Sequence, residues 1–193
     1  SHVEFMRDVR ETAYTQGKVI YDADADYGGW WFCCFPYVFV QENDVLPFFI
    51  HCDDVEYGLR CGKKPIIIEG VQVWHETYDK RMTPLMQYYD TRNPMFVNQL
   101  YGFLPEPLQL LQQWKDKMTA FHVKGDWLSE YYVILAMNDF LKGMGWLKRI
   151  DAGKYHKKLQ KAKSCRVKNA ICWRLVEHRA KKKFMVHKNN GSG

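Results

Sequence analysis

The chain has 193 residues, 47% hydrophobic and 16% aromatic, a composition that is typical of a globular protein and excludes a disordered one. No apolar run reaches the roughly 20 residues that a membrane-spanning helix needs, and the longest candidate, residues 30–40, contains Pro36. The formal charge of +6 is uneven, because residues 142–188 hold 16 of the 28 Lys and Arg residues but only two of the 22 acidic ones. This basic tail suits an anionic partner, such as membrane lipid, a pyrophosphate group or nucleic acid.

The first half of the chain mixes predicted strands and helices. A strand-like segment, "GKVIYD", is followed by a polar loop at residues 22–29 that ends in two glycines. The apolar run 30–40 predicts a buried strand. Later in this half, the pattern predicts a helix at 53–62 that Gly62 ends, and two short β-branched strands within 65–75.

The second half of the chain reads as helices alone. Proline, aspartate and glycine residues mark the starts and stops of these helices. The predicted helices are residues 83–101 with a break at Asn93-Pro94, residues 105–122, residues 126–143 with Asp126 as N-cap, and the basic segment 154–188.

Two adjacent carboxylates, Asp53 and Asp54, follow the apolar stretch 46–52. One interpretation is a helix N-cap with a first-turn acid, which the helix dipole favours. The other is a general base, because a carboxylate activates a hydroxyl group when a neighbour holds it within hydrogen-bonding reach. Consecutive side chains point in different directions, so one carboxylate can face a cleft while the other anchors to backbone or to Arg60. Glu56 and Arg60 are expected to hold the helix in place.

Two pairs of adjacent residues that contain tryptophan, Trp74-His75 and Trp30-Trp31, offer further candidates. Trp74-His75 ends the second apolar run, and an imidazole suits Mn²⁺ when carboxylates complete the ligand set, although a histidine at a strand end is more often structural. Trp30-Trp31 follow Gly28-Gly29, which indicate a tight backbone turn with space for a bound molecule. These indoles are either core residues or a platform for sugar rings.

Two other patterns are weaker. Asp22, Asp24 and Asp26 imitate an Asp-x-Asp metal motif, but they lie in a loop and not at the end of a strand, so we interpret them as unrelated to a metal. The six cysteines form no C-x-x-C pair and indicate idle thiols in a reducing compartment. Zinc binding by Cys52 and Cys61 stays an alternative, although their spacing is not a recognised one.

Several motifs occur together, in an order and at a spacing that resemble one known family. The chain is similar to the galactofuranosyltransferase-like members of glycosyltransferase family 2, which act in bacterial polysaccharide assembly. The match covers about residues 20–100 and continues more weakly through "YYVILAMNDFLKG". The motifs that carry it are "GGWWFCCFP", "LPFFIHCDDVEYGLR", "VWHETYDKR" and "YYDTRNP".

The resemblance implies an α/β fold. Residues 1–100 would form the C-terminal, acceptor-side half of a GT-A-like catalytic domain, the nucleotide-diphospho-sugar transferase fold, with a mixed sheet. Residues 101–193 would form a helical domain with a basic tail. The family transfers a sugar from a nucleotide donor to an acceptor hydroxyl group with inversion.

Roles follow by motif. Asp54 would be the general base, and Asp53 would support it and touch the acceptor. His75 would bind the divalent metal, Mn²⁺ or Mg²⁺, that neutralises the leaving diphosphate. The acceptor sugar site would be lined by Trp30, Trp31 and Trp74.

The resemblance also implies partners. The donor would be a UDP- or dTDP-sugar, with galactofuranose favoured over rhamnose or a pyranose, and the acceptor a glycan or a lipid-linked glycan. The family's nucleotide-binding half lies upstream of these motifs, so we expect this chain to be a fragment with little turnover by itself. Exposed apolar surface predicts a homo-oligomer. The basic tail predicts a cytoplasmic protein bound peripherally to anionic lipid at the inner face of the cell membrane.

Two functions of other classes stay open. One is a non-catalytic glycan-binding scaffold that keeps the fold and has lost the reaction. The other is a nucleic-acid-binding module that uses the basic tail and nearby aromatics such as Trp173. No recognised nucleic-acid motif favours that module, and the Asp-rich loops argue against it. For the tail alone, a solvated basic helix without a partner is a further alternative.

Overall fold

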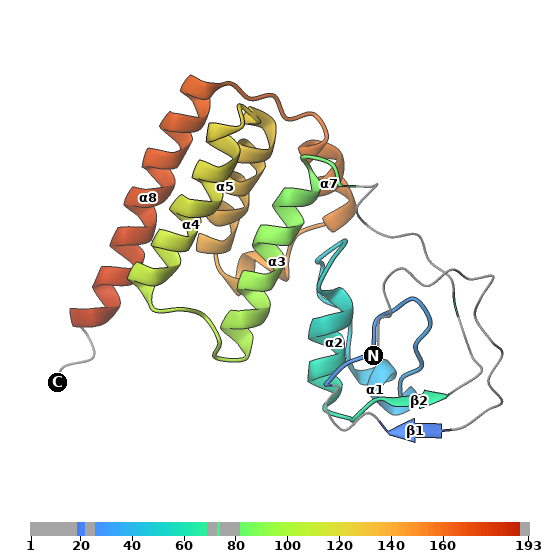
Figure 1. Ribbon diagram of the computed structural model, residues 1–193. Coiled ribbons are helices and arrows are strands. Elements are labelled where there is room, and N and C mark those ends of the chain that lie inside the picture. The colour runs from blue at the N-terminus through green and yellow to red at the C-terminus, as the bar shows by residue number, and fades with distance from the viewer. Residues whose placement is uncertain (1–18, 22–25, 69–72, 74–81, 190–193) are drawn as a thin grey trace. The chain divides into compact units, whose positions relative to one another are not determined.

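The computed structural model describes residues 19–21, 26–68, 73 and 82–189, and the chain divides into two compact units (Figure 1). Unit 1 comprises residues 1–46 and 52–81, and unit 2 comprises residues 47–51 and 82–193. The chain therefore passes from unit 1 to unit 2 and back within a few residues of the Asp53-Asp54 pair. The predicted enzyme domains, 1–100 and 101–193, stay a prediction.

The described part of unit 1 contains two short strands and two helices. β1 (Val19–Tyr21) pairs antiparallel with β2 (Ile66–Ile68), with Ile20 opposite Ile67. The helices are α1 (Tyr37–Glu42) and α2 (Asp53–Cys61). β1 and β2 confirm the strand-like segment before residue 22 and the first of the two strands within 65–75. Most of the rest of 65–75 lies outside the described residues.

The predicted α/β fold with a GT-A-like mixed sheet is wrong for the part of the chain that the structure describes. There, β1 and β2 form a single two-stranded pair, and the remaining regular structure is helical. The apolar run 30–40 is not a buried strand, because residues 37–42 form α1 and its residues are mostly exposed. Two strands of three residues give no sheet surface for helices to cover, since a stable sheet needs three or more strands with an apolar face.

The core of unit 1 is an aromatic cluster around Tyr57 of α2. The Tyr57 ring meets the rings of Trp30, Phe35 and Phe39 edge-on, at centroid distances of 5.4, 5.0 and 4.9 Å. The Tyr57 hydroxyl group donates to the backbone carbonyl of Asn43 at 2.9 Å. Edge-to-face contacts of this kind add to the burial of each ring, so residues 30–43 are packed onto α2 without strand pairing.

Glu56 and Arg60 hold α2 in place, as predicted. Glu56 is 3% exposed, and its Oε1 lies 2.9 Å from Arg60 Nε one helical turn away. Arg60 Nη2 also donates to the backbone carbonyl of Asp44 at 2.9 Å. The pair therefore neutralises a buried charge and ties the helix to the preceding loop. Gly62 ends α2 in the left-handed conformation, with φ of 64°, as its position predicts.

Unit 2 is helical in the part that the structure describes. α5 packs against α3, α4 and α8, which lie side by side in Figure 1. α4 begins at Pro107, two residues after the predicted start at residue 105. The Asp126 carboxylate caps α5 by accepting the backbone N–H of Ser129 at 3.1 Å, so this predicted N-cap is confirmed. The helices are α3 (Met86–Leu100), α4 (Pro107–Val123), α5 (Trp127–Leu141), α6 (Met144–Leu147), α7 (Ala152–Leu159) and α8 (Arg166–Asn189).

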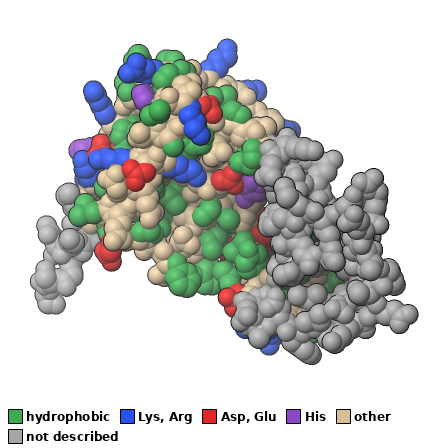
Figure 2. Space-filling view, in the orientation of Figure 1, with side chains coloured by type: hydrophobic (Ala, Val, Ile, Leu, Met, Phe, Trp, Pro, Cys, Tyr) green, Lys and Arg blue, Asp and Glu red, His purple; other side chains and the backbone are tan. Residues whose placement is uncertain are grey.

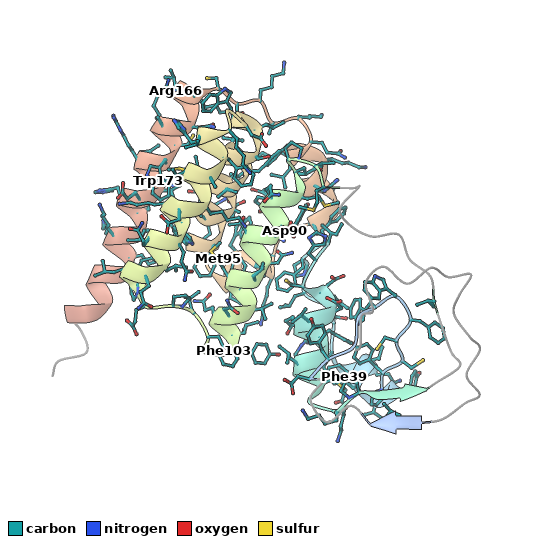
Figure 3. All side chains as sticks on the ribbon, viewed as in Figure 1. Phe39, Asp90, Met95, Phe103, Arg166 and Trp173 are labelled. Atoms are coloured by element: carbon teal, nitrogen blue, oxygen red, sulfur yellow. The ribbon has the colours of Figure 1, made fainter. Side chains whose placement is uncertain are left out.

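The predicted break at Asn93-Pro94 is wrong, because α3 continues through Pro94. A proline inside a helix removes one N–H donor and costs about 3 kcal/mol. Here the surrounding residues, 91–93 and 95–97, are all buried. Among them is Met95, labelled in Figure 3, whose sulfur atom accepts the indole N–H of Trp114. Burial of these residues outweighs the cost of placing Pro94 inside the helix.

A buried carboxylate lies at the centre of unit 2. Asp139 is fully buried, and its Oδ2 accepts the hydroxyl groups of Tyr88, at 2.8 Å, and of Tyr155. Lys142 Nζ lies 2.6 Å from Asp139 Oδ1. Burial raises the pKa of both tyrosines, so their hydroxyl groups stay protonated and donate to the carboxylate. The network satisfies a charge that would otherwise be costly inside a protein.

Candidate functional site around Asp54

Asp54 lies in the first turn of α2. The helix begins after Cys52, which is the N-cap in a left-handed conformation and makes no side-chain cap. The prediction that Asp53 or Asp54 is the N-cap is therefore wrong, because both lie inside the helix. Asp54 Oδ1 instead accepts the backbone N–H of Val55 at 2.8 Å. The carboxylate stays near the helix start, where the dipole favours negative charge.

The segment 27–31 lies over α2 and covers part of Asp54. Tyr27 passes so close to Gly58 that a Cβ atom added to Gly58 would lie 2.6 Å from the Tyr27 Cβ. A Cβ atom at Gly29 would lie 3.7 Å from Asp54 Oδ2 and 3.8 Å from a ring carbon of Trp31. The backbone at 28–29 thus runs beside the carboxylate, and Gly58 on the helix is what lets Tyr27 approach so closely.

This covering changes the acidity of Asp54. Burial raises the pKa of the Asp54 carboxyl group, the backbone N–H groups of Val55 and Trp30 oppose the rise, and the charge of Asp53 adds to it. The side chain is only half-buried, so it keeps access to solvent. Burial followed by the charge of Asp54 also raises the pKa of the Tyr27 hydroxyl group. A partly desolvated carboxylate with a raised pKa is the kind of group that serves as a general base.

Two of the three tryptophans of the predicted sugar site, Trp30 and Trp31, have different surroundings. Trp31 is 42% exposed and lies beside the Gly29 backbone next to Asp54. Trp30 packs in the aromatic cluster of unit 1, and its indole borders an open pocket of about 360 Å³. The other residues that line this pocket are Cys33, Phe35, Val40, Val45 and Tyr57. Trp31 is therefore the more exposed of these two indoles and the one that lies next to the backbone beside Asp54.

The remaining predicted site residues are Asp53, Trp74 and His75. Asp53 precedes Asp54, and its side chain is partly exposed. Trp74 and His75 lie outside the described residues. Of Asp22, Asp24 and Asp26, which imitate an Asp-x-Asp motif, only Asp26 lies in the described part of the chain. Its carboxylate forms an exposed ion pair with Lys64 at 2.8 Å. The structure thus brings Asp54, Trp31 and the 28–29 backbone together.

The described residues do not fit a metal site. No group of three or more His, Cys, Asp or Glu side chains in the described part of the chain is placed to hold an ion. Cys52 and Cys61, the zinc alternative, form no disulfide, and neither do the other four cysteines. We therefore derive no step through a metal ion.

Three contributors to the site were not predicted from the sequence. Burial and then the charge of Asp54 raise the pKa of the Tyr27 hydroxyl group, and burial and then the charges of Cys34 and Asp54 raise the pKa of the Cys33 thiol, so both side chains lie near Asp54. Gly58 allows the approach of Tyr27. A glycine in the middle of a short predicted helix is the one local signal that could have indicated a close backbone contact there.

The chain is similar in sequence to curated galactofuranosyltransferases, which confirms the resemblance indicated by the motifs. It is 33% identical over 130 residues to galactofuranosyltransferase GlfT2 of Mycolicibacterium smegmatis, which covers 62% of this chain and 19% of that protein. It is 34% identical over 80 residues to galactofuranosyltransferase GlfT2 of Mycobacterium tuberculosis, covering 38% of this chain and 13% of that protein. The chain thus spans less than a fifth of the length of these relatives.

Neither of the other comparisons adds to this likeness. No protein-family model matches the chain. No solved structure matches it either.

Proposed function

We propose that this chain is the acceptor-side part of a glycosyltransferase, and that it transfers galactofuranose from a nucleotide-sugar donor to a glycan or a lipid-linked glycan when nucleotide-binding residues are present. The observation that carries the proposal is the half-buried Asp54 carboxylate beside an exposed indole. The similarity to two galactofuranosyltransferases supports the class of reaction.

Asp54 is the proposed general base. Its carboxylate takes the proton of an acceptor hydroxyl group, and the oxygen then forms a bond to the anomeric carbon of the donor sugar. The bond between that carbon and the diphosphate oxygen breaks at the same time, with inversion, and the nucleoside diphosphate leaves. A carboxylate whose pKa is raised by burial binds the proton more tightly than an ordinary aspartate.

Trp31 is the proposed platform for the acceptor sugar. Its exposed ring lies on the same stretch of backbone as Gly29, which borders Asp54 Oδ2. A sugar whose apolar face covers this ring would have hydroxyl groups close to the carboxylate. Holding the acceptor hydroxyl group next to its base lowers the free-energy barrier of the transfer, because the two groups no longer have to meet by diffusion.

The donor nucleotide, UDP or dTDP, and the requirement for Mn²⁺ or Mg²⁺ remain predictions that rest on the resemblance alone. The same is true of Asp53 as the supporting residue, of His75 as the metal ligand, of Trp74 as part of the acceptor site, and of a homo-oligomer. Loss of transfer on addition of a chelator, with recovery on addition of Mn²⁺, would support the metal.

We propose that the basic tail binds anionic lipid at the cytoplasmic face of the membrane. Val167, Ile171 and Leu175 recur every four residues on α8, and all three are more than half exposed. Figure 2 shows Lys and Arg side chains interspersed with hydrophobic ones over the helical part. An apolar stripe among basic residues is typical of helices that lie on a membrane surface. No helix among the described residues combines the length and apolar character of a membrane span.

Sedimentation with vesicles tests the lipid proposal. We expect the chain to bind vesicles that contain phosphatidylglycerol and not vesicles of phosphatidylcholine alone, and we expect Ile171→Glu to weaken binding. Equal binding of the wild type to both vesicle types would contradict the proposal. Tight binding to duplex DNA with a steep dependence on salt would instead favour the nucleic-acid alternative.

Two measurements test the sugar-transfer proposal. In the first, the 193-residue chain is titrated with a galactofuranose-terminated oligosaccharide, and tryptophan fluorescence reports binding. In the second, transfer from UDP-galactofuranose is measured in a longer form that includes nucleotide-binding residues. We expect Asp54→Asn to lower kcat at least a hundredfold, while Asp44→Asn, a change at an exposed loop position, leaves kcat unchanged.

The outcomes separate the alternatives. Full activity of Asp54→Asn would reject Asp54 as the base. Glycan binding without any consumption of the nucleotide sugar would favour the non-catalytic scaffold.

A further inference from the structure

Phe49 of unit 2 presents an aromatic ring at the surface from a strained backbone. Its side chain is 47% exposed, and its φ is 75°. A positive φ is unusual for a bulky residue and persists only where neighbouring groups hold it. Strained residues gather at binding and catalytic sites. An exposed ring at such a position is therefore a candidate contact for a ligand.

Two buried residues of α3 hold the backbone on either side of Phe49. Arg92 is 1% exposed, and its Nη2 donates to the carbonyl of Phe48 at 2.9 Å. Asn93 is fully buried, and its Nδ2 donates to the carbonyl of Ile50 at 2.7 Å. Arg92 Nε also donates to Asn93 Oδ1 at 2.8 Å, which fixes the amide nitrogen toward the segment. All of these residues belong to unit 2, so the contacts that fix Phe49 lie within one unit.

One face of the Phe49 ring is stacked on two other rings of unit 2. Its centroid lies 4.2 Å from that of His156 on α7 and 5.8 Å from that of Tyr89 on α3, with interplanar angles of 22° and 25°. Tyr89 and His156 are themselves within 22° of parallel, and the Tyr89 hydroxyl group lies 2.9 Å from His156 Nδ1. These two rings are therefore joined edge to edge, and Phe49 lies across them. Because its partners cover one face, the exposed area of the Phe49 ring belongs to its other face and its rim.

The hydrogen bond between Tyr89 and His156 assigns the imidazole proton. Burial raises the pKa of Tyr89 to about 12, so its hydroxyl group stays protonated and donates to His156 Nδ1. Burial also lowers the pKa of His156, so the imidazole is neutral at pH 7 and carries its proton on Nε2. The stack therefore combines an exposed aromatic face with a neutral N–H donor at the ring beneath it.

We propose that the exposed face of Phe49 and the Nε2 of His156 form a sugar-binding subsite on unit 2, which takes a neutral sugar residue of the acceptor glycan. A sugar ring has an apolar face that packs on an aromatic ring and hydroxyl oxygens that accept from an N–H group, which is the combination offered here. The subsite is additional to Asp54 and Trp31, which belong to unit 1. That its sugar is part of the acceptor rests on the proposed function.

The test follows the ring signals of His156 by NMR in the 193-residue chain while a galactofuranose-terminated oligosaccharide is added. Phe49→Gly removes the ring at a φ that glycine adopts without strain. Phe49→Tyr keeps the ring, and Phe103→Ala removes another ring of unit 2, which is 75% exposed and labelled in Figure 3. Each variant is also made in a Trp31→Ala chain, which removes the sugar platform proposed for unit 1. The titration needs no donor sugar and no transfer.

We expect the glycan to shift the His156 signals in the wild type and in Trp31→Ala. The affinity that these shifts report should fall about tenfold in Phe49→Gly and stay unchanged in Phe49→Tyr and Phe103→Ala. His156 shifts without any sugar transfer in the longer form would count against the proposed function and for the subsite.

Three results would overturn the subsite. The first is an unshifted His156 at glycan concentrations that saturate the tryptophan fluorescence, a result that needs no variant to fold and leaves the proposed function intact. The second is a Phe49→Gly chain that binds as tightly as the wild type. The third is a shift of His156 by single-stranded oligothymidylate and not by the glycan, which would assign the ring to a nucleotide base.

Discussion

Units 1 and 2 bury their residues in different ways. Within the described residues, Tyr57 is the one buried hydrophobic side chain of unit 1, whereas unit 2 buries residues of every helix from α3 to α8. In the described part of unit 1 the buried charge is Glu56, which is paired with Arg60. Unit 2 surrounds Asp139 with several donors. The proposed base thus lies in the less deeply packed unit, where a carboxylate can be partly desolvated and still reach a substrate.

The comparison predicts that loss of the central carboxylate of unit 2 has the largest effect on stability. Asp139→Ala leaves the Tyr88 and Tyr155 hydroxyl groups and the Lys142 ammonium group without their acceptor. We expect it to lower the free energy of unfolding by about 3–5 kcal/mol, measured by urea denaturation. Asp116→Ala, at an exposed carboxylate of α4, should change it by less than about 0.5 kcal/mol. Similar losses in both variants would contradict the buried network.

A smaller loss of unfolding free energy is expected in unit 1 when Gly58 gains a methyl group. Gly58→Ala would ordinarily stabilise a helix by about 1 kcal/mol, but here the new Cβ would lie 2.6 Å from Tyr27 Cβ. We expect a loss of about 1–3 kcal/mol, seen as faster amide exchange in α2. Gly153→Ala on α7, where the nearest atom is 3.6 Å from the added Cβ, should be neutral or stabilising. A stabilising Gly58→Ala would show that segment 27–31 does not lie on α2.

Trp31 should matter for binding and little for folding. Because its ring is 42% exposed, we expect Trp31→Ala to change the free energy of unfolding by less than about 1 kcal/mol. The affinity for a galactofuranose-terminated oligosaccharide should fall about tenfold, equivalent to about 1.4 kcal/mol, as measured by calorimetry. Phe32→Ala, at a neighbouring ring that is 66% exposed, serves as the control. An unchanged affinity in Trp31→Ala would exclude this indole as the sugar platform.

The smallest effect concerns the pH dependence of stability. Because the pKa of Asp54 is raised in the folded state, its contribution is fully present below the pKa of an unfolded aspartate, about 3.9, and is lost as the pH rises through the folded pKa. Asp54→Asn should therefore raise Tm slightly at pH 7 and have no effect near pH 3.

Asp151 provides a control of opposite sign. The backbone N–H and the side chain of Lys154 lower the pKa of this N-cap carboxylate of α7. Its contribution to stability is therefore present above the unfolded pKa and lost as the pH falls, so Asp151→Asn should lower Tm at pH 7. A lowered Tm in Asp54→Asn at pH 7 would show that Asp54 is not held in a desolvated position.

Much of the local structure could be predicted because its causes are local. Gly62, Pro107 and Asp126 mark helix ends by backbone conformation or by a single nearby hydrogen bond. The Asp53-Asp54 pair and Trp31 were candidate site residues for the same reason, since their chemistry is visible in the side chains themselves. The resemblance to galactofuranosyltransferases is likewise carried by short motifs.

The sequence by itself determined the helices of α2, α4 and α5, the role of Glu56 and Arg60 in holding α2, and the candidate groups whose chemistry suits action on a sugar. Only the tertiary structure decided that the apolar run 30–40 packs as rings against Tyr57 instead of joining a sheet, and that α3 continues through Pro94. The physical reason is that strand pairing and the tolerance of a helix for proline depend on partners distant in the sequence. A short apolar run becomes a strand only where another backbone is available to bond with it.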